Sequence, residues 1–271
     1  MSDKNTSPIY AIRKYGLRSF VFNTWSILTS DYVVVSFQKC GKTWLRMMLS
    51  KIISEKYNIK NIKLDLQEMT LFTAAPNILI SHAGSTKENN KIDFTKIFKN
   101  KKIIFLVRDP RDIVVSLFHG SRTRDMVYSG DDISVFIRDD GHGFKKIVDF
   151  MNTWSKEFSK RPHDFIMVKY GDMRKNTAPE LRRILEFMNI GVDDDLINRT
   201  VEYGSFNNMR KMEMKGEVDD YRMRPGNVND PNSFRTRKGK VGGYREELSE
   251  VDIQYVDNYV REKLAPSFGY N

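Results

Sequence analysis

Apolar positions along this chain fall into short continuous runs, separated by longer stretches with helical periodicity. The continuous runs predict buried strands, at residues 32–35, 77–82, 102–107 and 165–168. Helical spacing predicts amphipathic helices, at residues 44–57, 113–118, 133–138, 144–158, 178–188 and 250–264. Strands that alternate with helices are typical of an α/β fold with a parallel sheet and right-handed crossovers. We therefore expect residues 1–271 to form a single α/β domain in which helices flank a central parallel sheet.

The remaining segments show neither a continuous apolar run nor helical spacing. Residues 1–30 carry scattered aromatic side chains, and we expect them to pack as a leader on the edge of the domain. Residues 58–76 are predicted to be irregular and residues 85–100 to be exposed. Over residues 215–243 the hydrophobic content falls while glycine, proline, asparagine and charge increase. Because loops of this length are usually functional or mobile, we expect this one to be a mobile loop over the site.

The first predicted strand leads through a short turn into the first predicted helix. The turn, QKCGKT at residues 38–43, holds Gly41 together with Lys39 and Lys42. Free backbone N–H groups and the positive end of a helix make such a strand–turn–helix unit a binding site for anions, so we predict a P-loop-like phosphate site. The turn nearly matches the pattern G-x-x-x-x-G-K-[ST], but Ser36 stands at the first glycine, which counts against an ATPase or GTPase.

Charge and cysteine content narrow the classes of partner. Lys and Arg total 45 against 35 Asp and Glu, a net charge of +10, which suits a nucleic acid, an acidic membrane or an anionic small molecule. A nucleic-acid binder would carry a basic stripe with interleaved aromatics, whereas charges of both signs are mixed along most of this chain. The single cysteine, Cys40, excludes an internal disulfide and fits a reducing compartment. No segment has the length and apolarity of a signal peptide or membrane span, so we expect a cytoplasmic protein that binds neither nucleic acid nor membrane.

Three motifs occur in order along the chain. Residues 38–44, QKCGKTW, are similar to the P-K-S-G-T-T-W loop that binds the 5′-phosphosulfate in sulfotransferases. Residues 108–116, RDPRDIVVS, resemble that family's 3′-phosphate motif, and residues 237–244, RKGKVGGY, resemble its R-K-G-x-x-G-D-W segment. Weaker matches lie at residues 169–173 and 204–209. On these residues the chain resembles the sulfotransferases that use 3′-phosphoadenosine 5′-phosphosulfate (PAPS), nearest the cytosolic type.

The resemblance implies that two anion sites at one sheet edge bind PAPS as the donor and release adenosine 3′,5′-bisphosphate, with no metal required. Arg108, Ser116 and Arg237 would bind the 3′-phosphate, while the first turn would bind the 5′ group. Trp44 and Phe206 would enclose the adenine; without the resemblance, both would be interpreted as ordinary core residues. The implied donor-binding residues are Lys39, Cys40, Gly41, Lys42, Thr43, Trp44, Arg108, Ser116, Tyr170, Phe206, Met209, Arg237, Lys238 and Gly239.

Sulfuryl transfer needs a proton acceptor for the nucleophile and a cation on the departing oxygen. The resemblance implies that Lys39 stabilises the leaving phosphate. It also implies that His82, which ends the second predicted strand and aligns with the histidine of the family's K-T-H segment, is the general base. If His82 is not the base, Asp65 or Glu68 is the alternative, since other sulfotransferases use a carboxylate. The competing interpretation is a P-loop kinase or NTPase that uses ATP and Mg²⁺; it requires an acidic metal ligand after a later strand, where Asp109 is the only nearby acid.

Several positions depart from the family pattern. Cys40 replaces a serine and Lys42 a threonine of the first loop, and Ile80 replaces the lysine two residues before the histidine. Lys42 either adds a charge contact to the 5′-phosphate or points outward. The Cys40 thiol is either activated by the anion site or a passive substitute for serine.

The acceptor is predicted from loop composition alone. It should lie over His82, between residues 66–76, 83–90, 120–145 and 215–235, which are rich in polar and charged side chains. We therefore expect a small-molecule acceptor that is polar or cationic rather than steroid-like. Whether a hydroxyl or an amine is sulfated, and whether the protein is a monomer or a homodimer, stays open on the sequence.

Overall fold

The chain folds around a parallel sheet of four strands. The computed structural model describes residues 25–60, 62–70, 72–82, 93–123 and 128–270. The sheet has the order β2-β1-β3-β4 and consists of β1 (Tyr32–Val35), β2 (Ile78–Ser81), β3 (Lys102–Val107) and β4 (Phe165–Lys169). The predicted α/β class with a central parallel sheet is therefore confirmed, and the strands begin and end close to the expected residues.

The register of the strands brings their carboxyl ends to one edge of the sheet. Val35 of β1 pairs with Ser81 of β2 and with Phe105 of β3, and Val107 of β3 pairs with Lys169 of β4. The segments that follow the four strands therefore begin near one another. Ligands of open parallel sheets bind outside this edge, where successive connections leave a strand in opposite directions, and β1 occupies that position here.

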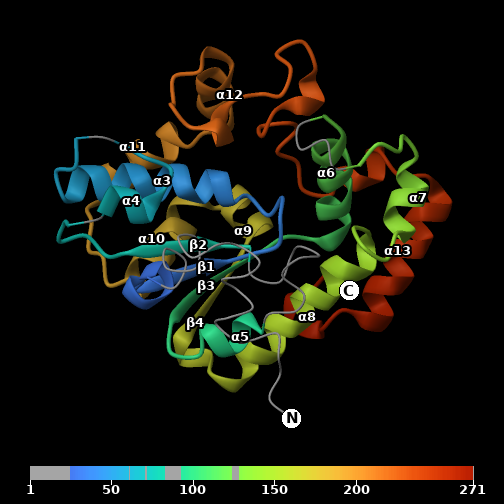
Figure 1. The fold of residues 1–271 in the computed structure, drawn as a ribbon, viewed down its shortest axis with the longest axis horizontal. Helices are drawn as coiled ribbons and strands as arrows, with labels where there is room; N and C mark the ends of the chain where they lie inside the picture. The colour runs from blue at the N-terminus through green and yellow to red at the C-terminus, as the bar shows by residue number, and fades with distance from the viewer. Residues whose placement is uncertain (1–24, 61, 71, 83–92, 124–127, 271) are drawn as a thin grey trace.

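Helices cover both faces of the sheet. Figure 1 shows α3 (Lys42–Lys56) and α4 (Leu66–Thr70) on one side of the strands, and α5 (Phe94–Ile97) and α8 (Phe144–Lys160) on the other. The other helices are α6 (Pro110–Thr123), α7 (Ile133–Arg138), α9 (Tyr170–Lys175), α10 (Thr177–Phe187), α11 (Asp194–Tyr203), α12 (Phe206–Lys215) and α13 (Glu250–Lys263). Short 3₁₀ turns are η2 (Pro162–Asp164), η3 (Tyr221–Met223), η4 (Pro231–Ser233), η5 (Gly243–Glu246) and η6 (Pro266–Phe268).

At least five helices, α4, α5, α9, α11 and α12, lie where the hydrophobic pattern predicts none. α4 and α5 fall in segments expected to be irregular or exposed, and they have only 5 and 4 residues, which is too short to show a helical period. α11 and α12 are longer, and each begins at a side-chain cap. Asp193 accepts a hydrogen bond from the N–H of Leu196, and Ser205 accepts one from Asn208. Asp and Ser are preferred residues at a helix N-cap, so these caps are the local signal that could have located both helices.

The segment expected to be a mobile loop is fastened to the domain by buried contacts. Glu213 is 1% exposed and accepts hydrogen bonds from the backbone N–H groups of Arg235 (2.7 Å) and Thr236 (3.1 Å). Met223 of η3 is fully buried. The mobility of this segment stays a prediction. Of the predicted leader, residues 1–24 lie outside the described residues.

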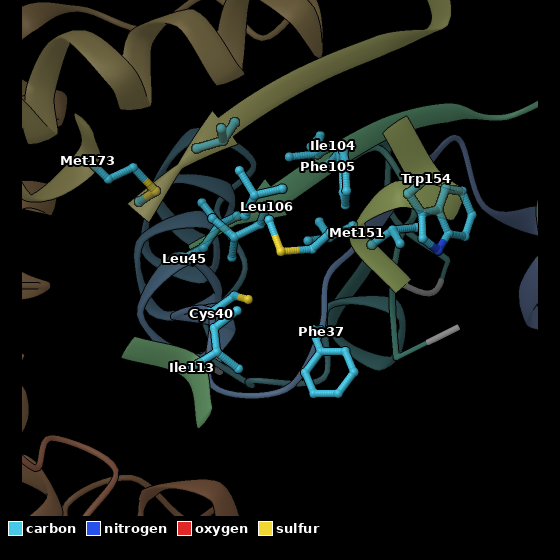
Figure 2. Close-up of a cluster of buried hydrophobic side chains, with 14 of the residues drawn as sticks. Phe37, Cys40, Leu45, Ile104, Phe105, Leu106, Ile113, Met151, Trp154 and Met173 are labelled. Carbon is cyan, nitrogen blue, oxygen red and sulfur yellow. The ribbon is translucent and has the colours of Figure 1, made fainter. Parts of the chain in front are cut away.

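A hydrophobic core joins the sheet to the helices. Figure 2 shows part of this core, with Trp154 of α8 and residues of β3 such as Phe105 and Leu106. Trp154 is 1% exposed, and its ring centroid lies 6.3 Å from that of Phe98 and 6.4 Å from that of Phe105. The indole ring therefore fills the space between α8 and the sheet.

Replacing Trp154 with alanine should lower the free energy of unfolding by about 3–5 kcal/mol, because a large buried ring is lost and a cavity remains. Urea denaturation followed by circular dichroism measures the change. Phe72→Ala is the control, because the Phe72 side chain is 97% exposed and its removal should change the value by less than about 0.5 kcal/mol. Similar losses in both variants would contradict this description of the core.

Candidate active site

The turn after β1 has the backbone shape of a phosphate-binding loop. Lys39 and Gly41 both adopt left-handed conformations, with φ of 64° and 94°. Such residues curl a turn so that its N–H groups can converge on an anion. Gly41 is needed for a second reason, because a Cβ there would lie 2.8 Å from the ring of Tyr170. α3 begins directly after the turn, at Lys42, so the start of a helix adds its N–H groups to the same place.

The side chain of Cys40, in the same turn, points into the hydrophobic core rather than into the site. The thiol is 1% exposed and belongs to the hydrophobic core shown in Figure 2. Burial raises the pKa of the Cys40 thiol to about 12, although the charges of Arg108 and Lys42 oppose this. The thiol is therefore protonated at neutral pH and behaves as a passive substitute for serine. Any contact with a ligand from this position comes through the backbone.

Lys42 points into the protein rather than outward. Its side chain is 7% exposed, and its Nζ donates a hydrogen bond to the carbonyl oxygen of Ser81 (3.3 Å) and contacts Nδ1 of His82. Burial, followed by the charge of Arg46, holds the pKa of the Lys42 ammonium well below its usual range. The sequence has Ile80 where the family has a lysine, so Lys42 brings an amino group to the end of β2 from a different element.

His82 follows β2 and lies beside Lys42 with its side chain exposed to the cavity described below. The pKa of the imidazole is held well below its ordinary value of 6.5, first because neighbouring protein atoms desolvate the ring and then because of the positive charges of Lys42 and Arg46. The ring is therefore neutral at pH 7. A neutral imidazole in this position is able to accept a proton from a bound molecule.

Arg108 follows β3 and bridges two distant segments of the site. Its guanidinium donates hydrogen bonds to the carbonyl oxygens of Lys39 (3.2 Å) and Lys240 (2.9 Å), and it lies over the ring of Tyr170, 4.5 Å from the centroid. The Nε of Arg108 is buried and has no hydrogen-bond partner among the described residues. A guanidinium held in this way suits a phosphate, because charge-assisted bonds to oxyanions are strong.

Asp112 of α6 holds the late motif against the 3′-phosphate motif. Its carboxylate accepts hydrogen bonds from the N–H groups of Gly242 (2.9 Å) and Tyr244 (3.1 Å), and it lies 3.7 Å from the guanidinium of Arg108. Residues 237–244 therefore pack beside residues 108–116, although residues 117–236 separate the two motifs in the sequence. Two of the three motifs thus meet in space.

Arg237 makes a two-pronged contact with a carboxylate in this structure. Its two terminal nitrogens each donate to Glu247 at 2.9 Å, and the same carboxylate lies 2.6 Å from Nε2 of His119 and 3.0 Å from Nζ of Lys238. Burial acts to raise the pKa of Glu247, but the hydrogen bonds from His119, Arg237 and Lys238 hold it well below its usual range. In this structure the Glu247 carboxylate is therefore the oxyanion bound by Arg237, the residue that the resemblance assigns to the 3′-phosphate.

Aromatic rings and two glycines shape the place expected for adenine. The rings of Trp44 and Tyr170 meet edge to face, with centroids 5.8 Å apart and planes at 73°. Phe206 begins α12 and lies against Gly239, where a Cβ would come within 2.8 Å of its ring. At Gly204 a Cβ would lie 2.7 Å from Cγ of Met48 and 3.3 Å from Nε1 of Trp44, so a larger residue there would crowd both side chains.

These groups line one cavity of about 470 Å³, a volume typical of small-molecule sites. Every implied donor-binding residue except Cys40 contributes to its lining, and so does His82. The side chain of Lys39 extends to Gly120 on α6, where a Cβ would overlap its ammonium group. The structure therefore brings the phosphate-binding turn, the two arginine positions and the histidine to the same place.

A comparison with protein families decides what kind of site this is. The family model described as the sulfotransferase domain matches residues 29–268. This chain belongs to the sulfotransferase family. The resemblance carried by the three motifs is thereby confirmed, and the match lends no support to the kinase or NTPase interpretation.

Individual relatives of this sulfotransferase are distant but cover most of its length. Sulfotransferase 6B1 of Mus musculus is 27% identical over 254 residues, which are 88% of this chain and 77% of the relative. Cytosolic sulfotransferase 17 of Arabidopsis thaliana is 24% identical over 263 residues, 87% of this chain and 74% of the relative. The crystal structure of mouse sulfotransferase SULT7A1 complexed with PAP has a TM-score of 0.65 and 20% identity, covering 87% of this chain and 84% of that chain. This likeness shows a shared fold.

The two carboxylates considered as alternative bases lie elsewhere in this sulfotransferase. Asp65 accepts a hydrogen bond from the backbone N–H of Glu68 (3.2 Å) at the start of α4, and Glu68 pairs with Lys63. Neither carboxylate belongs to the cavity lining. Both are accounted for by local contacts at a helix end.

Several cavity residues of this sulfotransferase carry no signal in the motifs. They are Arg46, Tyr221, Arg222, Arg235 and Glu247. None of them belongs to one of the three motifs, so only the fold reveals that they share the site. In the described part of the chain, no three His, Cys, Asp or Glu side chains gather to hold a metal ion. Within that same part, no helix combines the length and apolarity needed to cross a bilayer.

Proposed function

We propose that this sulfotransferase transfers a sulfuryl group from PAPS to a hydroxyl or amine of a small-molecule acceptor in the cytoplasm, with His82 as the general base. The observation that carries the proposal is the one cavity that holds the phosphate-binding turn, Arg108 and His82 together. The mouse SULT7A1 structure, which was determined with PAP, supports this donor. The Arabidopsis relatives named cytosolic sulfotransferases support the location.

Three elements supply the positive charge that a nucleoside with separate 3′ and 5′ anions requires. Lys39 comes from the turn after β1, Arg108 from the end of β3 and Arg237 from the late segment. The planar guanidinium fork suits two parallel hydrogen bonds to a phosphate. Binding of the 3′-phosphate would draw Arg237 away from Glu247 or make it share its donors between the two oxyanions.

The transfer is an in-line displacement at sulfur. The acceptor oxygen or nitrogen forms a bond to sulfur while the bond between sulfur and the 5′-phosphate oxygen breaks, and adenosine 3′,5′-bisphosphate leaves. Lys39 stabilises the negative charge that develops on the departing oxygen. The acceptor proton passes to His82, which keeps the nucleophile reactive as the new bond forms.

Lys42 sets the proton positions on His82. Because its pKa is lowered, Lys42 can be a neutral amine and accept a hydrogen bond from Nδ1–H of the imidazole, which it contacts. In that arrangement the lone pair lies on Nε2 and is available to the acceptor proton. The positive charges of Arg46 and Arg235 also oppose the protonation of His82.

The pH profile of turnover should reflect this environment. His82 becomes protonated only as the pH falls through its lowered pKa, and only then loses the lone pair that catalysis needs. At pH 6.5, where an ordinary histidine is half protonated, kcat should therefore stay close to its value at neutral pH. Steady-state kcat measured from about pH 5 to pH 8 tests this. A half-maximal loss of kcat at or above pH 6.5, with the fold intact by circular dichroism, would contradict it.

An acceptor screen tests the proposed function itself. The protein is incubated with PAPS and a panel of phenols, alcohols and amines, and mass spectrometry follows both the sulfated acceptor and adenosine 3′,5′-bisphosphate. We expect the two products to form in equal amounts. Transfer from ATP and Mg²⁺ to the same acceptors, in place of transfer from PAPS, would overturn the proposal.

A further inference from the structure

The cavity wall near His82 is unusually rich in arginine. Arg46 lies on α3, Arg222 in η3 and Arg235 in the segment before the late motif, and all three side chains line the cavity. Arg46 follows Lys42 by four residues on α3, so the two side chains share one face of that helix, and Lys42 touches His82. The charges of Arg46 and Arg235 both act on the imidazole of His82. Arg46 and Arg235 therefore lie near the place where the acceptor must present its proton, and Arg222 lies near Arg46.

Two of these arginines have no ion-pair partner within the part of the chain that the structure describes. Among the described residues, the guanidinium groups of Arg46 and Arg235 form neither an ion pair nor a hydrogen bond, and the Nε of each is buried without a partner. Arg222 differs, because its guanidinium donates to Asp220 at 2.7 Å. A partly buried cation whose Nε–H is buried without a partner costs free energy, which a bound anion would recover.

The lowered pKa of Arg46 indicates that its surroundings disfavour the positive charge. Burial and the charge of Arg222 lower the pKa of Arg46 to about 10, although the charges of Asp65 and Asp220 act in the opposite direction. Arg46 is still charged at neutral pH. The donor does not account for this charge, because Lys39, Arg108 and Arg237 already serve its two anionic groups.

We propose that the acceptor of this sulfotransferase is itself an anion, and that Arg46 and Arg235, with Arg222, bind an oxyanion group on it while its hydroxyl or amine faces His82. This inference rests on the proposed function. Loop composition predicted an acceptor that is polar or cationic; the inference keeps the polar acceptor and replaces the cationic one with an anion. The group recognised is a carboxylate, or a sulfonate or phosphate ester of similar shape, since a guanidinium fork binds all of these through paired hydrogen bonds.

The test uses phenols of similar shape and different charge. They are para-hydroxyphenylacetate and para-hydroxybenzenesulfonate as anions, para-ethylphenol as the neutral probe and tyramine as the cation. Each is titrated by calorimetry into protein saturated with adenosine 3′,5′-bisphosphate, so that the donor site is filled. We expect the better of the two anions to bind at least about ten-fold more tightly than para-ethylphenol, and tyramine to bind more weakly. The comparison of the two anions shows whether a carboxylate or a sulfonate is preferred.

Variants assign the preference to these side chains. Arg46→Gln and Arg235→Gln should each reduce the advantage of the anion by about ten-fold, while the affinity for adenosine 3′,5′-bisphosphate stays unchanged. Arg224→Gln is the matched control, because Arg224 is exposed, pairs with Asp219 and lies outside the cavity lining. Its anion preference should equal that of the unaltered protein. Thermal melting of each variant confirms that it is folded.

Three results would overturn the inference. The anions could bind no better than para-ethylphenol, or show no measurable binding; their advantage could survive in the Arg46→Gln/Arg235→Gln double variant; or the single variants could lose affinity for adenosine 3′,5′-bisphosphate instead, which would make the arginines donor ligands. Failure of the unaltered protein to bind adenosine 3′,5′-bisphosphate is a different result, because it would contradict the proposed function.

Discussion

His82→Ala is expected to lower kcat by about 10²–10⁴-fold while the affinity for adenosine 3′,5′-bisphosphate stays nearly unchanged. The variant removes the proposed general base, and the turn after β1 and Arg108 remain in place. Single-turnover transfer from PAPS measures the chemical step, and calorimetry measures nucleotide binding. A loss confined to the chemical step identifies His82 as a catalytic residue rather than a donor ligand.

His163→Ala is the matched control for this experiment. His163 lies in η2, which precedes β4 at the opposite edge of the sheet, and its side chain is exposed. Turnover of this variant should equal that of the unaltered protein. Retained turnover in His82→Ala would remove His82 as the base. A parallel loss of nucleotide affinity would show that its role is structural.

Lys39→Ala is expected to lower kcat by about 10²–10³-fold, a larger effect than the one on nucleotide affinity. Lys39 belongs to the turn proposed to bind the 5′ group, and its ammonium group lines the cavity beside Gly120 of α6. Charge on the departing phosphate oxygen grows as the bond to sulfur breaks, so a cation at this place acts mainly on the transition state.

A lysine far from the cavity serves as the control for Lys39. Lys96 on α5 pairs with Asp93, and its side chain is 80% exposed. Lys96→Ala should leave kcat unchanged. If Lys39→Ala changed kcat by less than about three-fold, or lowered kcat/KM for the donor through KM alone, Lys39 would be a binding residue only.

Much of the fold could be predicted from the sequence because buried parallel strands are continuous apolar runs. β1 is fully buried at Val33, Val34 and Val35, and these residues form a continuous apolar run in the sequence. The sequence pattern did not predict α11 and α12, because half-exposed helices on the outside of the domain bury few residues. Their sequence signal lies in the N-cap residues Asp193 and Ser205. Periodicity detects burial, so elements with little buried surface are the ones it misses.

The site likewise contains residues that could be predicted from the sequence and residues that could not. Positions that bind through a local motif, such as Gly41 or Arg108, could be proposed from the sequence, and the structure places both in one cavity. The pairing of Arg237 with Glu247, the inward turn of Lys42 and the burial of Cys40 depend on contacts between separate elements. No local pattern encodes such contacts, so the arginines that line the cavity near His82 became visible only in the fold.

The account depends on one cavity that recognises a nucleoside carrying both a 3′ and a 5′ anion. The most direct test is the thermal stability of the protein with adenosine 3′,5′-bisphosphate, compared with ATP·Mg²⁺ and with a single-stranded oligonucleotide. At about 100 times its Kd, adenosine 3′,5′-bisphosphate should stabilise the fold by about 2.7 kcal/mol, and the other two should have little effect at the same concentration. Stabilisation by ATP·Mg²⁺ that equals or exceeds that of adenosine 3′,5′-bisphosphate would contradict the account.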